Sequence, residues 1–344
     1  MTRLLHEGLP LLDVRAPVEY QQGAIPGSEN HPILDDAQRH RVGLTYKHSG
    51  PDAAEALGHK LVSGAVKAQR LSAWSSFVRN HPTAQVMCWR GGRRSTLAQQ
   101  WLAEEGIHLE RVPGGYQSLR RACLDTLEKA TDGPKQWWVV AGRTGVQKTV
   151  LINRLPNSID LEGLAHHRGS AFGAHATPQP TPANFENALA CAFLQHQSNQ
   201  LVLEDESRTI GRLALPVNWH QHMQQAPLVL LEADLTHRVQ HIVTEYVTQA
   251  LVAGESSDTL QGRYRDSLRR ITRRLGGSLH RHIEMLLERA FAGQEPHEAW
   301  VEALLQGYYD PMYDYQLKRK AVRIHFRGNQ QEIIDFLRQQ NRAL

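Results

Sequence analysis

The stretch Trp137-Trp-Val-Val-Ala-Gly-Arg-Thr-Gly-Val-Gln-Lys-Thr149 decides the fold of the second half of this 344-residue chain. Its first five residues form an apolar run that predicts a buried strand, and a glycine-bearing segment then leads into a helical pattern at Lys148–Leu155. Strand, loop and helix in this order predict a phosphate-binding P-loop, in which Lys148 reaches an anion and the Thr149 hydroxyl can meet Mg²⁺. The expected anion-binding residues are Gly142, Arg143, Thr144, Gly145, Gln147, Lys148 and Thr149.

Gln147 departs from the P-loop pattern, which has glycine just before the lysine. We expect its side chain to crowd bound phosphates or to shift the loop. An eroded loop without function is therefore the alternative interpretation, although the remaining glycines, Lys148 and Thr149 favour anion binding.

Apolar runs and helical patterns alternate after residue 136, which predicts a parallel α/β sheet. The expected strands are Trp137–Ala141, Asn157–Leu161, Leu201–Leu203 and Leu228–Glu232, and the expected helices include Ala183–His196 and Leu235–Val247. The break Asp132-Gly-Pro134 separates them from an earlier strand–loop–helix pattern. We therefore expect an α/β protein with one domain at residues 1–132 and a P-loop domain at 136–344 that ends in a helical extension from about residue 255.

Two further segments of the P-loop domain carry polar side chains. Glu204, Asp205 and Glu206 follow a buried strand, where Asp205 with Thr149 would hold Mg²⁺ beside the phosphates; a solvated turn is the alternative. The loop at 166–173 is expected to close over an anionic substrate, with a plain surface turn as an equally favoured alternative. Its candidate residues are His167, Arg168, Gly169 and Ser170.

Positive charge is concentrated near residue 270. The whole chain has 39 Lys and Arg against 35 Asp and Glu, a net charge of +4, but residues 263–281 hold seven arginines and one acid, Asp266. The apolar spacing around Leu268 and Ile271 predicts an amphipathic helix, and a solvated helix face is the alternative. Because one acid leaves little internal pairing, we expect an RNA-binding surface. Its candidates are Arg263, Arg265, Arg269, Arg270, Arg273 and Arg274.

Cys88 ends a short apolar run in the first domain and precedes a loop that leads into a helix starting near Ser95. Loop amides and the helix dipole favour a thiolate and an anion bound at the sulfur. The loop residues assigned to the anion are Trp89, Arg90, Gly91, Gly92, Arg93, Arg94 and Ser95. Cys123 and Cys191 lack such a loop and are expected to be inert core residues.

Three cysteines without C-x-x-C spacing argue against disulfides and structural zinc, and imply a reducing compartment. The sequence also has no apolar run long enough to span a bilayer and no signal-peptide layout. We therefore expect a cytoplasmic protein without a membrane partner.

Residues 1–130 resemble the rhodanese (sulfurtransferase) family, and the addition of a P-loop domain resembles the bacterial tRNA 2-selenouridine synthase family, also described as the tRNA 2-thiouridine geranyltransferase/selenotransferase. The rhodanese resemblance rests on Cys88-x-x-Gly91-x-Arg93, Asp13-Val-Arg15, Gly23-Ala-Ile-Pro-Gly27 and Val112-Pro-Gly-Gly-Tyr116. The second resemblance rests on the runs 42–47, 160–173, 204–211 and 308–315.

The resemblance implies two steps at the wobble uridine of tRNA that contains 2-thiouridine. Geranyl diphosphate first alkylates the sulfur, with Lys148, Thr149 and an Asp205-held Mg²⁺ stabilising the leaving diphosphate. Selenium from selenophosphate then displaces the S-geranyl group of the uridine. Cys88 takes part in this step, in which it either carries a perselenide or attacks the selenium donor. The enzyme that produces selenophosphate is an expected partner.

Two other functions remain open at the level of the sequence. One is an NTP-dependent rhodanese-type tRNA sulfurtransferase, in which Cys88 carries a persulfide and the P-loop domain hydrolyses ATP or GTP. The other is an RNA-binding regulator with two decayed catalytic folds, which Gln147 would suit and the complete Cys88 loop argues against.

Overall fold

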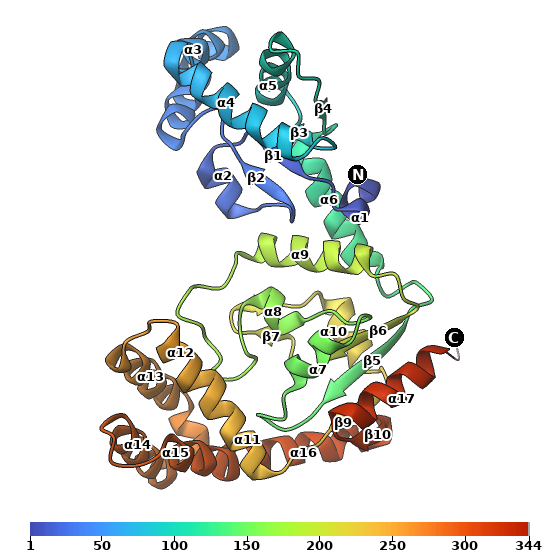
Figure 1. Cartoon of the computed structure of the whole chain (residues 1–344), viewed down its shortest axis with the longest axis vertical. Coiled ribbons are helices and arrows are strands. Elements are labelled where there is room, and N and C mark those ends of the chain that lie inside the picture. The colour runs from blue at the N-terminus through green and yellow to red at the C-terminus, as the bar shows by residue number, and fades with distance from the viewer. Residues whose placement is uncertain (343–344) are drawn as a thin grey trace. The chain divides into compact units, whose positions relative to one another are not determined.

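The computed structural model describes residues 1–342, and the chain forms two compact units (Figure 1). The first contains Met1–Ala130 and Pro180–Gln195, and the second contains Thr131–Gln179 and His196–Leu344. The division near residue 130 lies beside the expected linker. The helix α9 (Pro182–Gln195), which the sequence assigned to the second domain, joins the first unit because it packs against α6 (Gly115–Lys129) and α1 (Thr2–Glu7). Residues 343 and 344 of the expected second domain lie outside the described part.

The first unit is built on a parallel sheet with the strand order β2-β1-β3-β4. The central strand β1 pairs on both sides, since Leu12 lies opposite Glu29 on one neighbour and opposite Val86 on the other. The strands are β1 (Leu11–Asp13), β2 (Ser28–Asn30), β3 (Gln85–Met87) and β4 (Glu110–Arg111). The remaining helices are α2 (Pro17–Gln22), α3 (Asp36–Leu61), α4 (Gly64–Asn80) and α5 (Arg93–Glu104).

Helix α3 is longer than its sequence suggests. It begins after Asp35, whose carboxylate accepts a hydrogen bond of 2.8 Å from the Gln38 amide. Gly50, at φ +84°, and Pro51 form a kink inside the element. Two helical stretches therefore meet at this kink, and the break before α4 falls at Val62-Ser63.

The second unit has a parallel sheet of order β10-β9-β5-β6, as the alternating pattern predicted. Its strands are β5 (Gln136–Ala141), β6 (Gln200–Glu204), β9 (Leu228–Leu231) and β10 (Ile324–Gly328). The expected strand at 157–161 is wrong: only Ser158 bridges to Val202, and Asp160 then caps the short helix α8 (Leu161–Ala165). The edge strand β10 was missed because it alternates half-buried and exposed residues inside a helical region.

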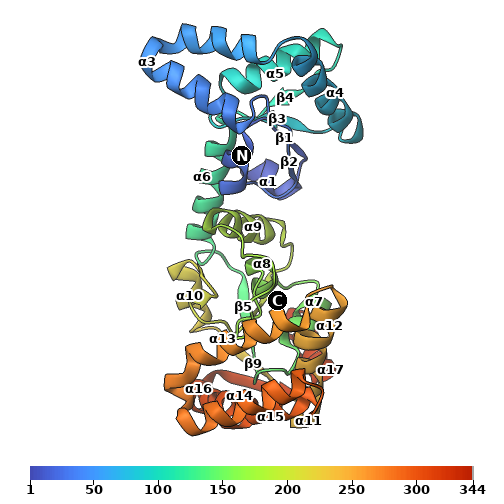
Figure 2. The same ribbon diagram turned by 90° about the vertical axis from the view of Figure 1, so that its left-hand side faces the viewer.

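Helices α7 (Lys148–Arg154), α10 (Val217–Met223) and α17 (Gln330–Arg342) pack on this sheet, and β7 (Thr209–Ile210) and β8 (Leu213–Ala214) form a small hairpin. The C-terminal helices build a separate core around the buried Tyr264, Leu268 and Trp300, with α13, α14 and α15 in successive contact (Figures 1 and 2). They are α11 (Leu235–Ile242), the π-helical segment η1 (Val243–Thr248), α12 (Gln249–Val252), α13 (Ser257–Leu275), α14 (Gly277–Phe291), α15 (His297–Leu304), the π-helical segment η2 (Leu305–Tyr309), α16 (Asp310–Lys320) and the turn η3 (Ala321–Arg323). Within residues 1–342, no helix has the length and apolarity to cross a membrane.

Candidate functional site

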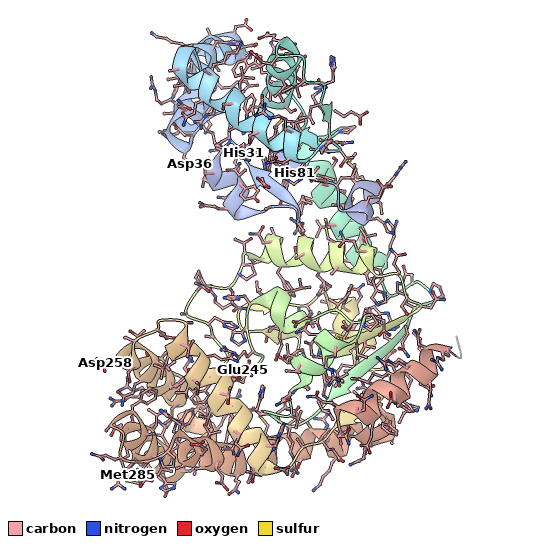
Figure 3. All side chains as sticks on the ribbon, viewed as in Figure 1. His31, Asp36, His81, Glu245, Asp258 and Met285 are labelled. Carbon is pink, nitrogen blue, oxygen red and sulfur yellow. The ribbon has the colours of Figure 1, made fainter. Side chains whose placement is uncertain are left out.

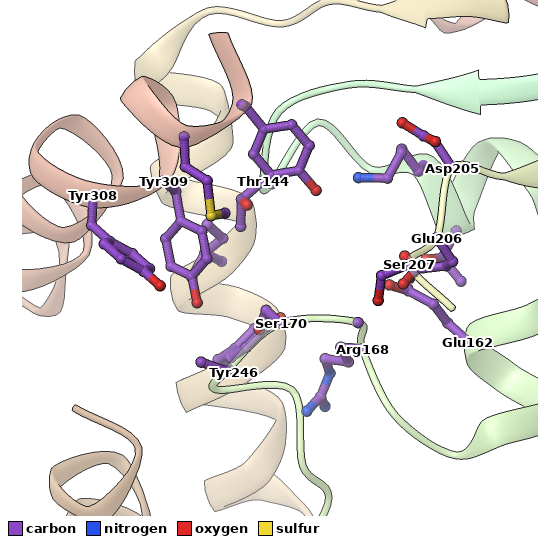
Figure 4. A pocket seen from close by; sticks show the side chains of 18 of the residues that line it. Thr144, Glu162, Arg168, Ser170, Asp205, Glu206, Ser207, Tyr246, Tyr308 and Tyr309 are labelled. Atoms are coloured by element: carbon purple, nitrogen blue, oxygen red, sulfur yellow. Dashed lines mark hydrogen bonds between the residues drawn. The ribbon is translucent and has the colours of Figure 1, made fainter. Parts of the chain in front are cut away.

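The P-loop of the second unit opens into a cavity of about 350 Å³ (Figure 4). Glu162, Asp205 and Glu206 lie at one side, and Tyr308 and Tyr309 of η2 lie at the other, with Tyr246 of η1 beside Arg168 between them. The polar lining includes Lys148, Thr149, Glu162, Arg168, Asp205 and Glu206, and the aromatic and apolar lining includes Ile242, Tyr246, Ile271, Tyr308, Tyr309, Met312 and Tyr313. The acids therefore lie opposite Tyr308 and Tyr309, which we call the apolar wall, while His241, Glu245 and Arg274 add further polar side chains to the lining.

Lys148 lies at the charged side of this cavity. Its Nζ donates to the Gly142 carbonyl at 3.1 Å and lies 5.7 Å from the centre of the Tyr313 ring. Burial lowers the pKa of Lys148, but the charges of Tyr313, Glu162, Glu206 and Asp205 outweigh burial and leave this pKa raised. Lys148 is thus a half-buried cation whose charge its acidic neighbours stabilise.

Gln147 occupies the left-handed region at φ +67°, the conformation that glycine supplies at this position of the pattern. Its side-chain amide contacts His237 Nε2 at 3.2 Å and accepts a hydrogen bond of 2.9 Å from Gln330. The loop therefore keeps its positive φ although residue 147 has a side chain. This conformation strains the backbone at Gln147.

A buried carboxyl pair lies beside the P-loop. Thr149 Oγ1 donates to Glu162 at 2.7 Å, and Glu162 is hydrogen-bonded to Glu206. Burial, with the neighbouring charge of Glu162, raises the pKa of Glu206 to about 8, and burial also raises that of Glu162. Glu204 is fully buried, so its pKa lies well above the usual range, and its carboxylate accepts a hydrogen bond from the Leu161 amide. Glu204 and Glu206 therefore do not lie in a solvated turn.

Asp205 has a different partner from the one expected. Both of its carboxylate oxygens accept hydrogen bonds from Lys320, at 2.6 and 2.8 Å, while the Thr149 hydroxyl is directed to Glu162. Within residues 1–342, no group of three or more His, Cys, Asp and Glu side chains is placed to hold a metal ion. Thr149 and Asp205 are thus each bound to another side chain, and the Mg²⁺ position assigned to them stays a prediction.

The loop after α8 contributes three of its four candidates to the cavity: Arg168, Gly169 and Ser170. Arg168 donates to Glu245 on η1 at 2.8 Å and covers the Tyr246 ring at 4.8 Å (Figure 3 labels Glu245). Gly169 is at φ +62°, where a Cβ would lie 2.4 Å from Glu162. His167 is not in the cavity lining, and burial lowers its pKa.

Sequence reasoning gave no role to the residues of the apolar wall. Tyr308 and Tyr309 belong to the run 308–315 quoted for the family resemblance, but no function was assigned to that run from the sequence. Burial raises the pKa of Tyr246 and of Tyr309, so both remain neutral phenols. Lys320 was not identified from the sequence, because its partner Asp205 is 115 positions away. Glu162 was not identified, because the short helix α8 was not expected.

The expected arginine-rich helix is α13, and its arginines differ in their pairing. Arg263 pairs with Glu255, and Arg265 lies 3.3 Å from Glu288 on α14. The expectation of little internal pairing is therefore wrong for these two, because acids outside the counted segment reach them. Four remain exposed on the helix: Arg269, Arg270, Arg273 and Arg274. Arg274 also lines the P-loop cavity.

In the first unit, Cys88 is buried at the base of the expected loop. Its Sγ lies 3.3 Å from Ser95 Oγ, and its carbonyl accepts a hydrogen bond of 2.8 Å from the Tyr116 amide. Gly91 and Gly115 permit this packing, since both are at positive φ and a Cβ on Gly115 would lie 2.2 Å from the Cys88 carbonyl oxygen. The loop is thus clamped against the segment that contains Tyr116.

The arginines of the Cys88 loop are held by other side chains. Arg90 donates to Gln117 at 3.2 Å, Arg93 pairs with Glu55, and Arg94 is bidentate on Glu19. Burial lowers the pKa of Arg94, but its bonds to Glu19, with a smaller contribution from Cys88, raise the pKa overall. Cys123 and Cys191 are buried and free, as expected for core cysteines.

Comparison with known proteins identifies the family. The family model of the tRNA 2-selenouridine synthase AAA domain matches residues 135–344. The chain is 47% identical to the tRNA 2-selenouridine synthase of Bordetella bronchiseptica, over 97% of this chain and 95% of that one. It is 46% identical to that of Pseudomonas fluorescens Pf0-1, over 97% and 95%, and 44% identical to that of Hydrogenovibrio crunogenus, over 98% of each chain. The chain belongs to the tRNA 2-selenouridine synthase family.

Proposed function

We propose that this chain is a tRNA-modifying transferase that converts 2-thiouridine at the wobble position into S-geranyl-2-thiouridine and then into 2-selenouridine. The observation that carries the proposal is the P-loop cavity of the second unit, which is lined both by the cation Lys148 and by tyrosines. A diphosphate with a hydrocarbon tail matches such a mixed lining.

The first step takes place in this cavity. The diphosphate of geranyl diphosphate lies against the loop and Lys148, and the geranyl chain lies against Tyr246, Tyr309 and Met312. The sulfur of 2-thiouridine forms a bond to C1 of the geranyl group, and the C1–O bond to diphosphate breaks. Lys148 stabilises the negative charge that develops on the leaving group.

Alkylation at sulfur also releases the N3 proton of the uridine ring. The leaving diphosphate, which gains negative charge when the C1–O bond breaks, accepts this proton. The exposed arginines of α13, which extend to the cavity at Arg274, bind the tRNA backbone.

The second step takes place at the rhodanese-like loop of the first unit. The Cys88 thiolate attacks the phosphorus of selenophosphate, so that an S–P bond forms, the P–Se bond breaks and selenide leaves. Selenide adds to C2 of the S-geranyl nucleoside and expels geranyl thiolate, and water then releases phosphate from Cys88. We place the reaction in the cytoplasm, with the selenophosphate-producing enzyme as the supplier of the donor.

The proposal is tested with purified protein and tRNA that contains 2-thiouridine. Mass spectrometry of digested tRNA is expected to detect S-geranyl-2-thiouridine when geranyl diphosphate is added, and 2-selenouridine only when selenophosphate is added as well. An NTP-dependent sulfurtransferase would instead hydrolyse ATP or GTP in a tRNA-dependent manner and form no geranylated nucleoside, which would contradict the proposal.

A further inference from the structure

Two adjoining cavities of the first unit have opposite chemistry. The first, of about 290 Å³, is lined mainly by apolar side chains of α3, of α5 and of the segment after β2, and we call it the apolar pocket. Its lining includes Ile33, Leu34, Val42, Ala54, Gly58, Val62, Leu97 and Trp101. The second, of about 730 Å³, is lined by three cations and one acid, and we call it the basic cavity. Its lining includes Glu19, Arg39, His40, Lys47, Trp89 and Arg94.

The two cavities are continuous with each other and with the Cys88 loop. Leu34, Val42, Tyr46 and Arg94 line both of them. Trp89 and Arg94 of the Cys88 loop line the basic cavity, and Arg93 and Arg94 of the same loop line the apolar pocket. A ligand that occupies both cavities therefore lies against the loop that carries Cys88.

Three charged side chains at the apolar pocket, Glu55, Arg93 and Arg94, already have ionic partners. Arg93 forms an ion pair with Glu55, and Glu55 lies 3.9 Å from His59. Arg94 is bidentate on Glu19, which Arg39 also approaches at 3.2 Å. In the basic cavity three cations, Arg39, Lys47 and Arg94, outnumber the single acid Glu19, so that side keeps a positive charge that attracts a polyanion.

We propose that the apolar pocket holds the prenyl chain of S-geranyl-2-thiouridine while the basic cavity holds the phosphates next to that nucleoside. This assignment rests on the proposed function and adds the place where the modified nucleoside is recognised for the second step. An apolar chain on a polyanion is complementary to an apolar pocket that opens into a basic cavity. Selenophosphate, a small trianion, matches only the basic side.

The arrangement gives the second step a reason to follow the first. A prenyl chain in the apolar pocket anchors the nucleoside beside Cys88, whereas 2-thiouridine without the chain leaves that pocket unfilled. Burial of even two methylene groups strengthens binding by about tenfold. The Cys88 site is therefore selective for the geranylated nucleoside.

Gly58 offers a direct way to fill the pocket. It lies in α3 at an ordinary backbone conformation, and a Cβ placed on it meets no atom within 4 Å. In Gly58→Leu the new side chain takes up space that the prenyl chain would use. Ala56→Leu is the matched control, because Ala56 is exposed on the same helix and does not line the pocket. Leu97→Gln is a second variant, which makes the pocket polar without filling it.

The experiment measures binding of the full chain to two anticodon oligonucleotides that carry either S-geranyl- or S-methyl-2-thiouridine. The wild type and Ala56→Leu are expected to bind the geranyl form at least about tenfold more tightly. Gly58→Leu and Leu97→Gln are expected to lose most of this preference and keep their affinity for the methyl form. An undiminished preference in both variants overturns the inference, as does an equal loss of affinity for both oligonucleotides.

A separate assay distinguishes this outcome from failure of the proposed function. Wild-type protein is incubated with the geranyl oligonucleotide and selenophosphate, and the nucleosides are analysed by mass spectrometry. If the wild type forms no 2-selenouridine, the proposed function fails, whatever the binding results. If the wild type forms it and Gly58→Leu forms it equally fast, only the assignment of the apolar pocket is wrong.

Discussion

Lys320 Nζ lies 2.6 and 2.8 Å from the two carboxylate oxygens of Asp205, so that the C-terminal end of α16 is tied to the residue that follows β6. Both side chains are largely buried, with 18% and 7% of their surfaces exposed. The ion pair holds the helix that carries Tyr313 against the acidic side of the P-loop cavity. Asp205 therefore acts as an anchor for the apolar wall.

Removal of Lys320 should leave a largely buried carboxylate without its partner. We expect Lys320→Met to lower the free energy of unfolding by roughly 2–3 kcal/mol, less than for a fully buried pair because part of Lys320 is exposed. The double variant Asp205→Asn/Lys320→Met should recover part of this loss. Urea unfolding of the two single variants and the double variant measures the coupling, and additive effects would show that the ion pair has no structural role.

Separate substitutions should block the two proposed steps one at a time. Lys148→Ala removes the cation that stabilises the leaving diphosphate, so no geranylated nucleoside should form, while tRNA that is already geranylated is still selenated. Cys88→Ser should have the reverse effect and accumulate S-geranyl-2-thiouridine. Cys191→Ser, which changes another buried cysteine, is the control. Mass spectrometry of digested tRNA checks these outcomes, and the opposite pattern would refute the assignment of the two sites.

Diphosphate binding should weaken as the pH rises. Glu206 has a raised pKa of about 8 beside Glu162, Asp205, Lys148 and Thr149, so it is neutral below this pH and becomes negative above it. An added negative charge repels a bound diphosphate, and binding therefore favours the protonated form. Calorimetry between pH 7 and 9, in buffers of different ionisation enthalpy, should detect falling affinity and proton uptake. Glu206→Gln should abolish both, and persistence of the proton uptake in this variant would exclude Glu206 as its source.

The unpaired arginines of α13 should carry the salt dependence of tRNA binding. We expect Arg273→Ala/Arg274→Ala to weaken binding and to reduce the slope of log affinity against log salt by about two, because both side chains are exposed and free for phosphates. Arg263→Ala is the comparison, since Arg263 is held by Glu255 and by the Ala174 carbonyl. An equal change of slope in the two variants would mean that pairing within the protein does not decide which arginines contact RNA.

Local patterns predicted those features of the chain that depend on neighbouring residues. The strand before Gly142, the helix from Lys148 and the loop after Cys88 lie where apolar runs, glycines and capping residues indicated. Contacts between remote segments could not be predicted in this way: Lys320 meets Asp205 across 115 positions, and α9 packs on α6. The apolar wall could not be predicted for the same reason. A tyrosine-rich helix has the same sequence pattern whether it packs in a core or lines a cavity.

Gln147 provides a test of backbone strain at the P-loop. Its left-handed conformation costs a non-glycine residue about 1 kcal/mol, and its bonds to His237 and Gln330 offset part of that cost. Gln147→Gly removes the strain together with the bonds, so stability should change little and diphosphate affinity should rise, whereas Gln147→Ala keeps the strain and loses the bonds. We therefore expect Ala to be less stable than Gly by about 1 kcal/mol in urea unfolding. Equal stability of the two variants would show that the loop relaxes around position 147. If the diphosphate affinity of Gln147→Gly also equals that of the wild type, the result supports the interpretation of an eroded loop without function.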